Sequence, residues 1–236
     1  MKFMVSENAV WLVEGVIAHR LIHPQIGTDL SALTALSPTG RETLVTTART
    51  NAEQRAVADL TPQLPIARAG KILCLGHNYI DHVKEGGYDI PKYPAIFMRT
   101  TTSLTPAGGA IIRPNVSHRL DFEVELMIVV GKGGRNIKAA EAMEAIFGYT
   151  VFNDGTIRDH QKRSHQWTPG KNFDSTGGIG PFVVTRDEIP DPQNLKMTTR
   201  LNGEVMQDGT TADMMWKVAQ IIEVMSEFST LEPGDL

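Results

Sequence analysis

Short apolar runs separated by turn residues recur along the chain, whereas long amphipathic segments are few. Runs of this kind, rich in β-branched and aromatic residues, are typical of strands. They predict strands over 10–17, 41–46, 72–75, 95–98, 110–113, 120–130, 149–153, 182–185 and 197–201. Apolar residues at helical spacing, or residues suited to helix ends, predict helices over 48–60, 76–85, 139–147 and 213–225. The pattern therefore predicts a β-dominated α+β fold.

The chain divides into two predicted units at a linker over 61–70 that is rich in Pro and Gly. Residues 1–68 are expected to form a small, strand-rich N-terminal domain. Residues 69–236 are expected to form the catalytic domain, which starts with the strand at 72–75. Near its end, Asn202 and Gly203 predict a tight hairpin turn between two strands.

Three carboxylates, Asp121, Glu123 and Glu125, alternate along the predicted strand at 120–130. Side chains alternate between the two faces of a strand, so these three share a face. Neighbouring carboxylates on a partly buried face repel one another, so either their pKa values rise or a cation lies among them. The run that follows is apolar on both faces, which favours a buried strand over a solvated acidic edge strand.

Asp154 ends the predicted strand at 149–153 and is placed to complete a site with Glu123 and Glu125. Three carboxylates without a Cys or His ligand pattern suit a hard divalent ion such as Mg²⁺, Mn²⁺ or Ca²⁺. We therefore predict a metal-dependent active site. Asp121 is a further ligand, a partner of the ligands or simply the first residue of the strand, and the pattern does not decide among these.

His82 and Glu85 lie three residues apart on the predicted helix at 76–85, and hence on one face of it. A carboxylate that bonds one imidazole nitrogen fixes the tautomer and leaves the other nitrogen as a base. Such a pair is more often a surface ion pair. Its position directly after a buried strand favours a functional role, because sites collect at such loops.

Arg158, Gln161 and Lys171 follow Asp154 within a polar stretch. Cations and amides beside a metal site can hold an anionic substrate or a developing oxyanion. Taken alone, these three are ordinary loop residues, so their role depends on the carboxylates nearby.

Composition narrows the function classes. A net charge of −4 over 236 residues gives no electrostatic footprint for nucleic acid or an anionic membrane. The single cysteine, Cys74, lies in an apolar run and is expected to be a buried strand residue. The N-terminus lacks the apolar core of a signal peptide, and no stretch approaches the roughly 20 apolar residues of a membrane span. A cytoplasmic location is therefore expected.

Several motifs follow one another along residues 69–236, and their order is more specific than any one of them. They are Asn78-Tyr79-x-x-His82-x-x-Glu85, Asp121-Phe-Glu-Val-Glu-Leu126, Gly131-Lys132, Gly148-Tyr-Thr-Val-Phe-Asn-Asp154, Arg158-Asp159-x-Gln161, Trp167 with Lys171-Asn-Phe-Asp174, Gly180-Pro181, Leu201-Asn-Gly203 and Leu231-Glu-Pro-Gly-Asp235. Together they resemble the fumarylacetoacetate hydrolase family. Within it, they are most similar to the acylpyruvate hydrolases and the 2-hydroxyhepta-2,4-diene-1,7-dioate isomerase-like members.

The resemblance implies a roll-like, β-rich catalytic domain that assembles as a homodimer. It implies Mg²⁺ or Mn²⁺ held by Glu123, Glu125 and Asp154. It also implies a small-molecule 2-oxo or 2,4-dioxo acid substrate, chelated to the metal through its 2-oxo carboxylate.

The reaction expected from the resemblance is metal-dependent hydrolysis of a C–C bond in an acylpyruvate-like 2,4-dioxo acid. His82, oriented by Glu85, would activate the attacking water. Lys171 and Gln161 would stabilise the oxyanion, and Arg158 would bind the substrate. The metal would act as a Lewis acid on the product enolate.

Two alternatives stay open. One is decarboxylation or isomerisation of an unsaturated 2-oxo diacid from aromatic-compound catabolism, which needs no attacking water. The other is a non-catalytic binding relative. The resemblance leads us to expect a further strand and a Thr-Gly-Thr-Pro-x-Gly loop after 231–235, so the catalytic domain is expected to lack its C-terminal part at Leu236. Position 99 is arginine where many relatives have lysine, with no consequence assigned.

Overall fold

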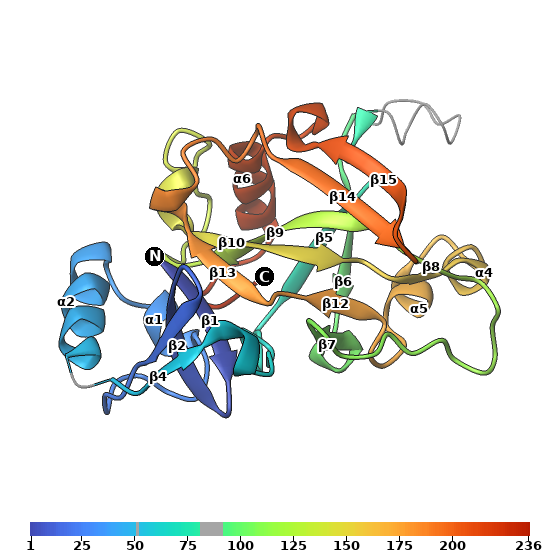
Figure 1. Cartoon of the computed structure of the whole chain (residues 1–236). Helices are drawn as coiled ribbons and strands as arrows, with labels where there is room; N and C mark the ends of the chain where they lie inside the picture. Colours follow the sequence, from blue (N-terminus) through green and yellow to red (C-terminus); the bar gives the residue numbers. More distant parts are fainter. Residues whose placement is uncertain (51, 81–91) are drawn as a thin grey trace.

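The computed structural model describes residues 1–50, 52–80 and 92–236. It confirms the β-dominated α+β fold, which is built around one large sheet (Figure 1). Nine strands form this sheet, with β9 (Val124–Val130) beside β10. The others follow the order β4 (Gln54–Ala56), β3 (Ile17–Arg20), β2 (Ala9–Glu14), β1 (Lys2–Ser6), β13 (Phe182–Thr185), β10 (Ile146–Asn153), β12 (Gly177–Ile179) and β7 (Leu104–Pro106).

Three smaller strand pairs make up the rest of the β structure in the described ranges. They are β5 (Ile72–Gly76) with β6 (Ala95–Arg99), β8 (Leu120–Asp121) with β11 (Thr156–Ile157), and β14 (Lys196–Leu201) with β15 (Glu204–Thr210). The β14–β15 hairpin turns at Asn202 and Gly203, whose φ angles are +52° and +89°. Two successive positive φ angles are what Asn-Gly turns in tight hairpins require, so the predicted turn is confirmed.

Helices are few in the part of the chain that the structure describes, and the two longest of them cover different parts of the sheet (Figure 1). In α6 (Val218–Phe228), Val218, Ile222 and Met225 recur at helical spacing and pack with Val130 and Tyr149. The other is α2 (Pro38–Arg49). Short helices are α1 (Ser31–Thr34), α4 (Arg158–Gln161) and α5 (Thr168–Lys171), with 3₁₀ turns at Val57–Asp59, Thr101–Ser103, Ala142–Ala145, Arg186–Glu188 and Thr211–Asp213.

The structure corrects two predictions near α2. The segment 41–46 is helical rather than a strand, and 48–60 holds the end of α2, β4 and a 3₁₀ turn rather than a helix. Ser37 caps α2 by accepting a hydrogen bond from Gly40 N at 3.1 Å, and Pro38 occupies the first turn. The buried residues of α2 lie at helical spacing, a signal that the short apolar run at 41–46 concealed: Arg41, Leu44, Val45 and Ala48.

Other boundaries differ as well. The predicted helix at 139–147 is only a 3₁₀ turn, because Ile146 and Phe147 enter β10 and pair within the sheet. No strand forms at 110–113. The predicted helix at 76–85 runs into 81–91, which lie outside the described residues. The strand predicted at 120–130 is two strands, β8 and β9, separated at Phe122 and Glu123.

The N-terminal region shares a sheet with the rest of the chain. Strand β1 pairs antiparallel with β13, with Phe3 opposite Val183. Phe3 also stacks on Phe147 of β10, with ring centroids 6.2 Å apart, inside one buried apolar cluster. The domain boundary at residue 68 stays a prediction. Within the described ranges, no helix is both long and apolar enough to cross a membrane.

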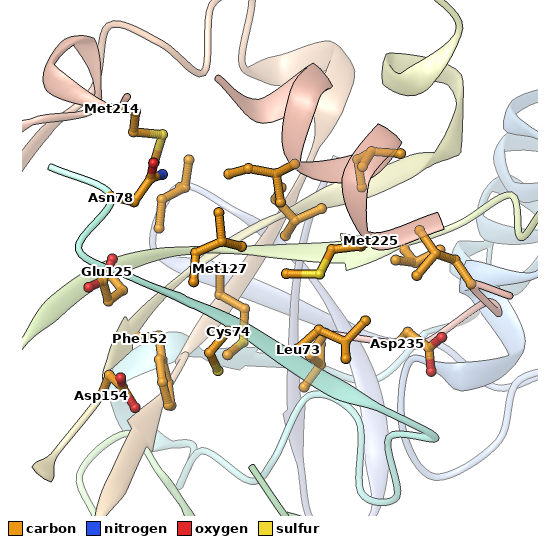
Figure 2. A pocket seen from close by; sticks show the side chains of 18 of the residues that line it. Leu73, Cys74, Asn78, Glu125, Met127, Phe152, Asp154, Met214, Met225 and Asp235 are labelled. Carbon is orange, nitrogen blue, oxygen red and sulfur yellow. The ribbon is translucent and has the colours of Figure 1, made fainter. Parts of the chain in front are cut away.

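The last residues join β5 to β9. Leu236 N donates to Lys71 O at 3.0 Å and Leu236 O accepts from Leu73 N at 2.8 Å, while Asp235 O accepts from Val130 N at 2.9 Å. A narrow, mainly apolar cavity of about 110 Å³ continues from there between β5, β9 and α6. Figure 2 shows Asp235 at one end of it, and Glu125 and Asp154 at the other. This cavity leads to the carboxylates of the site.

Candidate active site

Strands β9 and β10 bring the predicted metal ligands together. Glu125 lies opposite Phe152 in the register of the two strands. Beyond the end of β10, Asp154 N donates to Glu123 O at 2.8 Å, so the backbone holds Asp154 beside Glu123. Glu123 N in turn donates to Asn153 Oδ1 at 3.0 Å. The interruption between β8 and β9 does not separate the two glutamates, because both line a second, larger cavity.

This cavity has a volume of about 650 Å³, within the usual range for small-molecule sites. Four groups of residues form its walls. The group at β5 and β6 consists of Leu75, Gly76, His77, Asn78, Tyr79 and Phe97, and the group at β9 consists of Glu123, Val124 and Glu125. The group at α4 and α5 consists of Arg158, Gln161, Lys162, Ser164, Trp167 and Lys171. The group at the β14–β15 hairpin consists of Met197, Met206, Gln207, Asp208, Gly209, Thr210 and Asp213. The cavity therefore combines acidic, basic and apolar walls.

Lys171 links two of the carboxylates. Its side chain is 2% exposed, and Nζ lies 2.9 Å from Glu123 Oε2 and 2.5 Å from Asp154 Oδ2. The short helix α5 carries it there, and Gly170 permits the close approach of α5 to α4, because a Cβ at Gly170 would lie 2.5 Å from Gln161 N. The ammonium group thus partly neutralises Glu123 and Asp154, two of the three predicted metal ligands.

Two arginines add to this charge balance. Arg158 Nε donates to Asp121 Oδ2 at 2.8 Å, and its Nη1 lies 2.5 Å from Glu123 Oε1. Arg99 Nη1 donates to Asp154 Oδ1 at 2.5 Å from a fully buried position. Asp121 is therefore a partner of Arg158, which in turn contacts Glu123.

The two glutamates differ in their acidity. Burial is the largest influence on Glu123 and acts to raise its pKa, but Lys171 and Arg158 together outweigh it, so the pKa lies below its usual range. For Glu125, burial and then the charges of Glu123 and Asp154 raise the pKa well above its usual value. Crowded carboxylates are expected to have either a nearby cation or raised pKa values. Both occur at this site, because Lys171 and Arg158 contact Glu123 and the pKa of Glu125 is raised.

The chemical type of the predicted ligand atoms suits a hard divalent ion. Glu123, Glu125 and Asp154 supply carboxylate oxygens, which Mg²⁺ and Mn²⁺ prefer, and Glu125 has a raised pKa that a cation would reverse. The described residues contain no group of three or more His, Cys, Asp or Glu side chains already arranged to hold an ion. Lys171 Nζ contacts Glu123 Oε2 and Asp154 Oδ2, which are oxygens of two of the three proposed ligands.

The remaining predicted residues have different outcomes. Gln161 lines the cavity, and its Oε1 accepts from Arg158 Nη1 at 3.1 Å, which leaves its amide nitrogen as the end that can donate to a ligand. His82 and Glu85 lie outside the described residues, so their role stays a prediction.

Arg99 was noted in the sequence without a role. Its place beside Asp154 follows from the pairing of β5 with β6 and from the position of β6 behind β10, which a local pattern does not reveal.

An aromatic wall was not predicted. Trp167 packs edge-on against Phe97 and His77, with ring centroids 5.7 Å and 5.1 Å apart. Gly76 at the end of β5 makes room for this ring, because a Cβ there would lie 1.8 Å from Trp167 Cζ3. Trp167 alone gave no signal in the sequence beyond its place in an ordered motif.

Two side chains of the β14–β15 hairpin, Gln207 and Met197, contact residues of the site. Gln207 Oε1 accepts from Val124 N at 3.0 Å and from Thr199 Oγ1 at 2.8 Å. At the same wall, Tyr79 Oη lies 3.9 Å from Met197 Sδ. The hairpin therefore closes the cavity opposite α4 and α5.

Known proteins resemble the chain in sequence and in structure. The human protein named oxaloacetate tautomerase FAHD2A, mitochondrial, is 41% identical over 202 residues, which cover 84% of this chain and 64% of that protein. The chain thus spans less than two thirds of that relative. Because this relative is mitochondrial by name, the expected cytoplasmic location of the present chain stays a prediction.

Solved structures agree with this likeness. The 2-hydroxyhepta-2,4-diene-1,7-dioate isomerase from Mycobacterium marinum has a TM-score of 0.78 and 30% identity, and the match covers 100% of this chain and 84% of that one. The fumarylacetoacetate hydrolase from Exiguobacterium antarcticum has a TM-score of 0.83 and 29% identity, with the same coverage. A family model described as fumarylacetoacetate (FAA) hydrolase C-terminal matches residues 71–236. The chain therefore belongs to the fumarylacetoacetate hydrolase family.

Proposed function

We propose that this chain is a metal-dependent isomerase that moves a proton between the keto and enol forms of a small 2-oxo acid. The keto form loses a proton from the carbon next to the carbonyl and gains one on the carbonyl oxygen, so substrate and product have equal mass. The single observation that carries the proposal is the cavity in which Glu123, Glu125, Arg158, Gln161 and Lys171 meet.

The family context supports an isomerase over a hydrolase. The family consists of enzymes, and its members generally depend on divalent metals. Of the three relatives named above, one is an oxaloacetate tautomerase, another is a 2-hydroxyhepta-2,4-diene-1,7-dioate isomerase and the third is a fumarylacetoacetate hydrolase. The first two names describe reactions that shift protons on an acid without breaking its carbon chain. The C–C hydrolysis expected from the sequence is therefore the second candidate for this chain.

Positive charge in the cavity suits the developing enolate. Lys171 and Arg158 lie on the wall formed by α4 and α5, and each has a donor atom within 3 Å of Glu123. The Gln161 amide nitrogen can donate to a substrate carboxylate or carbonyl oxygen. Arg158 is already held by its ion pair with Asp121 and its hydrogen bond to Gln161, so it needs little reorganisation when negative charge develops on the substrate.

We assign the metal to Glu123, Glu125 and Asp154, with Mg²⁺ or Mn²⁺ as the ion. When bound, a divalent ion supplies Lewis-acid stabilisation of negative charge on an oxygen. Phe97 and Trp167 form an apolar part of the wall of the same cavity.

Hydrogen–deuterium exchange tests the proposal directly. Oxaloacetate and other 2-oxo acids are incubated with the protein in D₂O, with Mg²⁺, with Mn²⁺ or with EDTA, and followed by proton NMR and mass spectrometry. The expected result is metal-dependent exchange of the proton next to the carbonyl and faster loss of the enol form, with the carbon skeleton intact.

The same samples identify the alternatives. Release of pyruvate plus a carboxylic acid from 2,4-dioxo acids would support the hydrolase, and release of CO₂ would support a decarboxylase. Tight binding of 2-oxo acids without exchange or products would support the binding relative.

A further inference from the structure

Arg99 lies behind Asp154 at the end of β6, with a side chain that is 0% exposed. Its guanidinium group is held by several acceptors at once. Nε donates to Ser103 Oγ at 3.1 Å, and Nη2 donates to Thr176 Oγ1 at 3.0 Å. Nη1 donates to Asp154 Oδ1 at 2.5 Å and to Gly155 O at 3.2 Å. A planar guanidinium bonded on every nitrogen cannot turn without breaking several hydrogen bonds.

The space around this arginine is also closed. A Cβ at Gly177 would lie 2.8 Å from Arg99 Nη2, and the Phe152 ring lies below the guanidinium with its centroid 5.4 Å from Cζ. Backbone and aromatic ring therefore confine the charged group, so that Arg99 is a fixed element of the fold beside a site that holds several charges.

The two oxygens of Asp154 have different cationic partners. Oδ1 accepts from Arg99 on the inner side, whereas Oδ2 contacts Lys171 Nζ, which also contacts Glu123. Lys171 ends a flexible side chain and lines the cavity, while Arg99 is absent from its lining. The partner of Oδ1 is therefore fixed, and the partner of Oδ2 is exchangeable.

We propose that Arg99 is a positioning residue that holds Asp154 through Oδ1 and so reserves Oδ2 for a divalent ion. The inference rests on the metal site proposed above. When an ion binds, the Lys171 ammonium leaves Oδ2, and Arg99 keeps the carboxylate oriented. Without Arg99, both oxygens of Asp154 could turn toward Lys171, and the ammonium would compete better with the ion.

The test measures ion binding, with no need for turnover. Titration calorimetry with Mn²⁺, supported by Mn²⁺ electron paramagnetic resonance, compares wild type with Arg99→Met and Arg99→Lys. We expect Arg99→Met to bind Mn²⁺ at least about tenfold more weakly, the size typical of lost partners of metal ligands. Arg99→Lys keeps a cationic donor for Oδ1 and should stay within about threefold of wild type.

Arg41→Met is the matched control, because Arg41 is also buried but packs over the Phe147 ring and does not line the cavity. It should lower thermal stability and leave Mn²⁺ affinity unchanged. Equal Mn²⁺ affinity in a folded Arg99→Met variant overturns the proposal, as does an equal loss in Arg99→Lys and Arg99→Met.

Arg99→Met removes one of the two cationic partners of Asp154. If this variant does not fold, its Mn²⁺ affinity cannot be measured. Thr176→Val then replaces it, because it loosens Arg99 at Nη2 and keeps both charges. We expect weaker Mn²⁺ binding in that variant, and unchanged binding overturns the proposal. If wild type itself binds no Mn²⁺, the metal site in the proposed function fails. If wild type binds and the Arg99 variants bind equally well, only the present inference fails.

Discussion

Lys171 is the side chain that touches two of the three proposed ligands, Glu123 and Asp154, from a buried position. Replacing it by Met leaves these carboxylates with less compensating charge. Loss of one partner from a buried ion pair costs about 3–5 kcal/mol, so we expect a clear drop in melting temperature without metal. Mg²⁺ or Mn²⁺ should then stabilise Lys171→Met more than wild type, because the ion replaces the missing cation.

Thermal unfolding with and without ion checks this prediction. The control Lys196→Met removes an exposed pair and should change the free energy of unfolding by less than about 1 kcal/mol. An ion-induced rise in melting temperature no larger in Lys171→Met than in wild type would contradict the exchange of ammonium for metal.

His82 is the base that the sequence predicts, with Glu85 as its partner. Loss of a general base typically lowers a rate by about 10²–10⁴-fold. We expect His82→Ala to lower kcat for proton exchange into a 2-oxo acid by this amount, while Mn²⁺ affinity stays unchanged because no proposed ligand is altered. Glu85→Gln should have a smaller effect in the same direction. Unchanged exchange kinetics in His82→Ala would remove the histidine from the mechanism.

At the scale of elements, the end of β5 and the aromatic wall depend on each other. Gly76→Ala places a methyl group where Trp167 now lies, so the ring must leave its position against Phe97. Overpacking of this kind costs about 1–3 kcal/mol, and a displaced Trp167 changes the shape of the cavity wall that it forms. We expect lower stability and a lower kcat/KM for proton exchange.

The matched control for this change is Gly178→Ala in β12. A Cβ at Gly178 would lie 3.6 Å from Ile111 Cδ1, which is an ordinary contact. Denaturant unfolding and steady-state kinetics of both variants provide the comparison. Equal stability and equal kinetic constants of the two alanine variants would show that the fit of Gly76 to Trp167 does not affect function.

Tyr149 on β10 gives the fold a defined sensitivity to alkaline pH. Burial raises its pKa to about 12, with Arg186 acting in the opposite direction. The unfolded chain loses this proton near pH 10, so stability falls as pH rises from about 10 to 12. At pH 11 the loss is about 1.4 kcal/mol relative to neutral pH.

Tyr149→Phe removes this titration. Among the described residues, the buried Tyr149 hydroxyl has no hydrogen-bond partner, so its removal should also stabilise the protein by about 1 kcal/mol at neutral pH. Urea unfolding at pH 8 and pH 11 should show the advantage of the Phe variant growing with pH. Tyr93→Phe, at a 54% exposed position, should show no such growth, and a constant difference for Tyr149→Phe would contradict the prediction.

At the scale of the whole molecule, the N-terminal region and the predicted catalytic domain share one sheet and one apolar cluster. Removing residues 1–68 would expose the β13 edge and the buried face of β10. Exposed strand edges with an apolar face promote aggregation. We therefore expect the chain 69–236 to aggregate or fail to unfold cooperatively, as measured by size-exclusion chromatography and circular dichroism.

A cleavable insertion between Arg68 and Ala69 is the control. After cleavage, the two pieces should elute together, because the β1–β13 pairing holds them. A stable, monodisperse chain 69–236 would instead support an independent catalytic domain. Chromatography of the uncut chain also tests the homodimer implied by the family resemblance, which stays a prediction.

Much of the local structure was predictable from the sequence. The strand at 182–185 and the turn at Asn202 and Gly203 follow from residues that are adjacent in the chain. The two-residue period of a strand predicted that Glu123 and Glu125 share a face. Both line one cavity, although Glu123 lies in the break before β9. The ordered motifs also identified the family, since each motif is a short, contiguous pattern.

The tertiary structure decided which cations meet the carboxylates. Arg99 and Asp154 are 55 residues apart, and Lys171 and Glu123 are 48 apart, so no local period links them. It also decided that Ile146 belongs to a strand, because pairing and burial within the sheet override a weak local preference for helix. Sequence by itself determined the side chains that carry the chemistry. Long-range strand pairing and packing determined their partners, since a residue's charge environment depends on segments that the chain brings together only on folding.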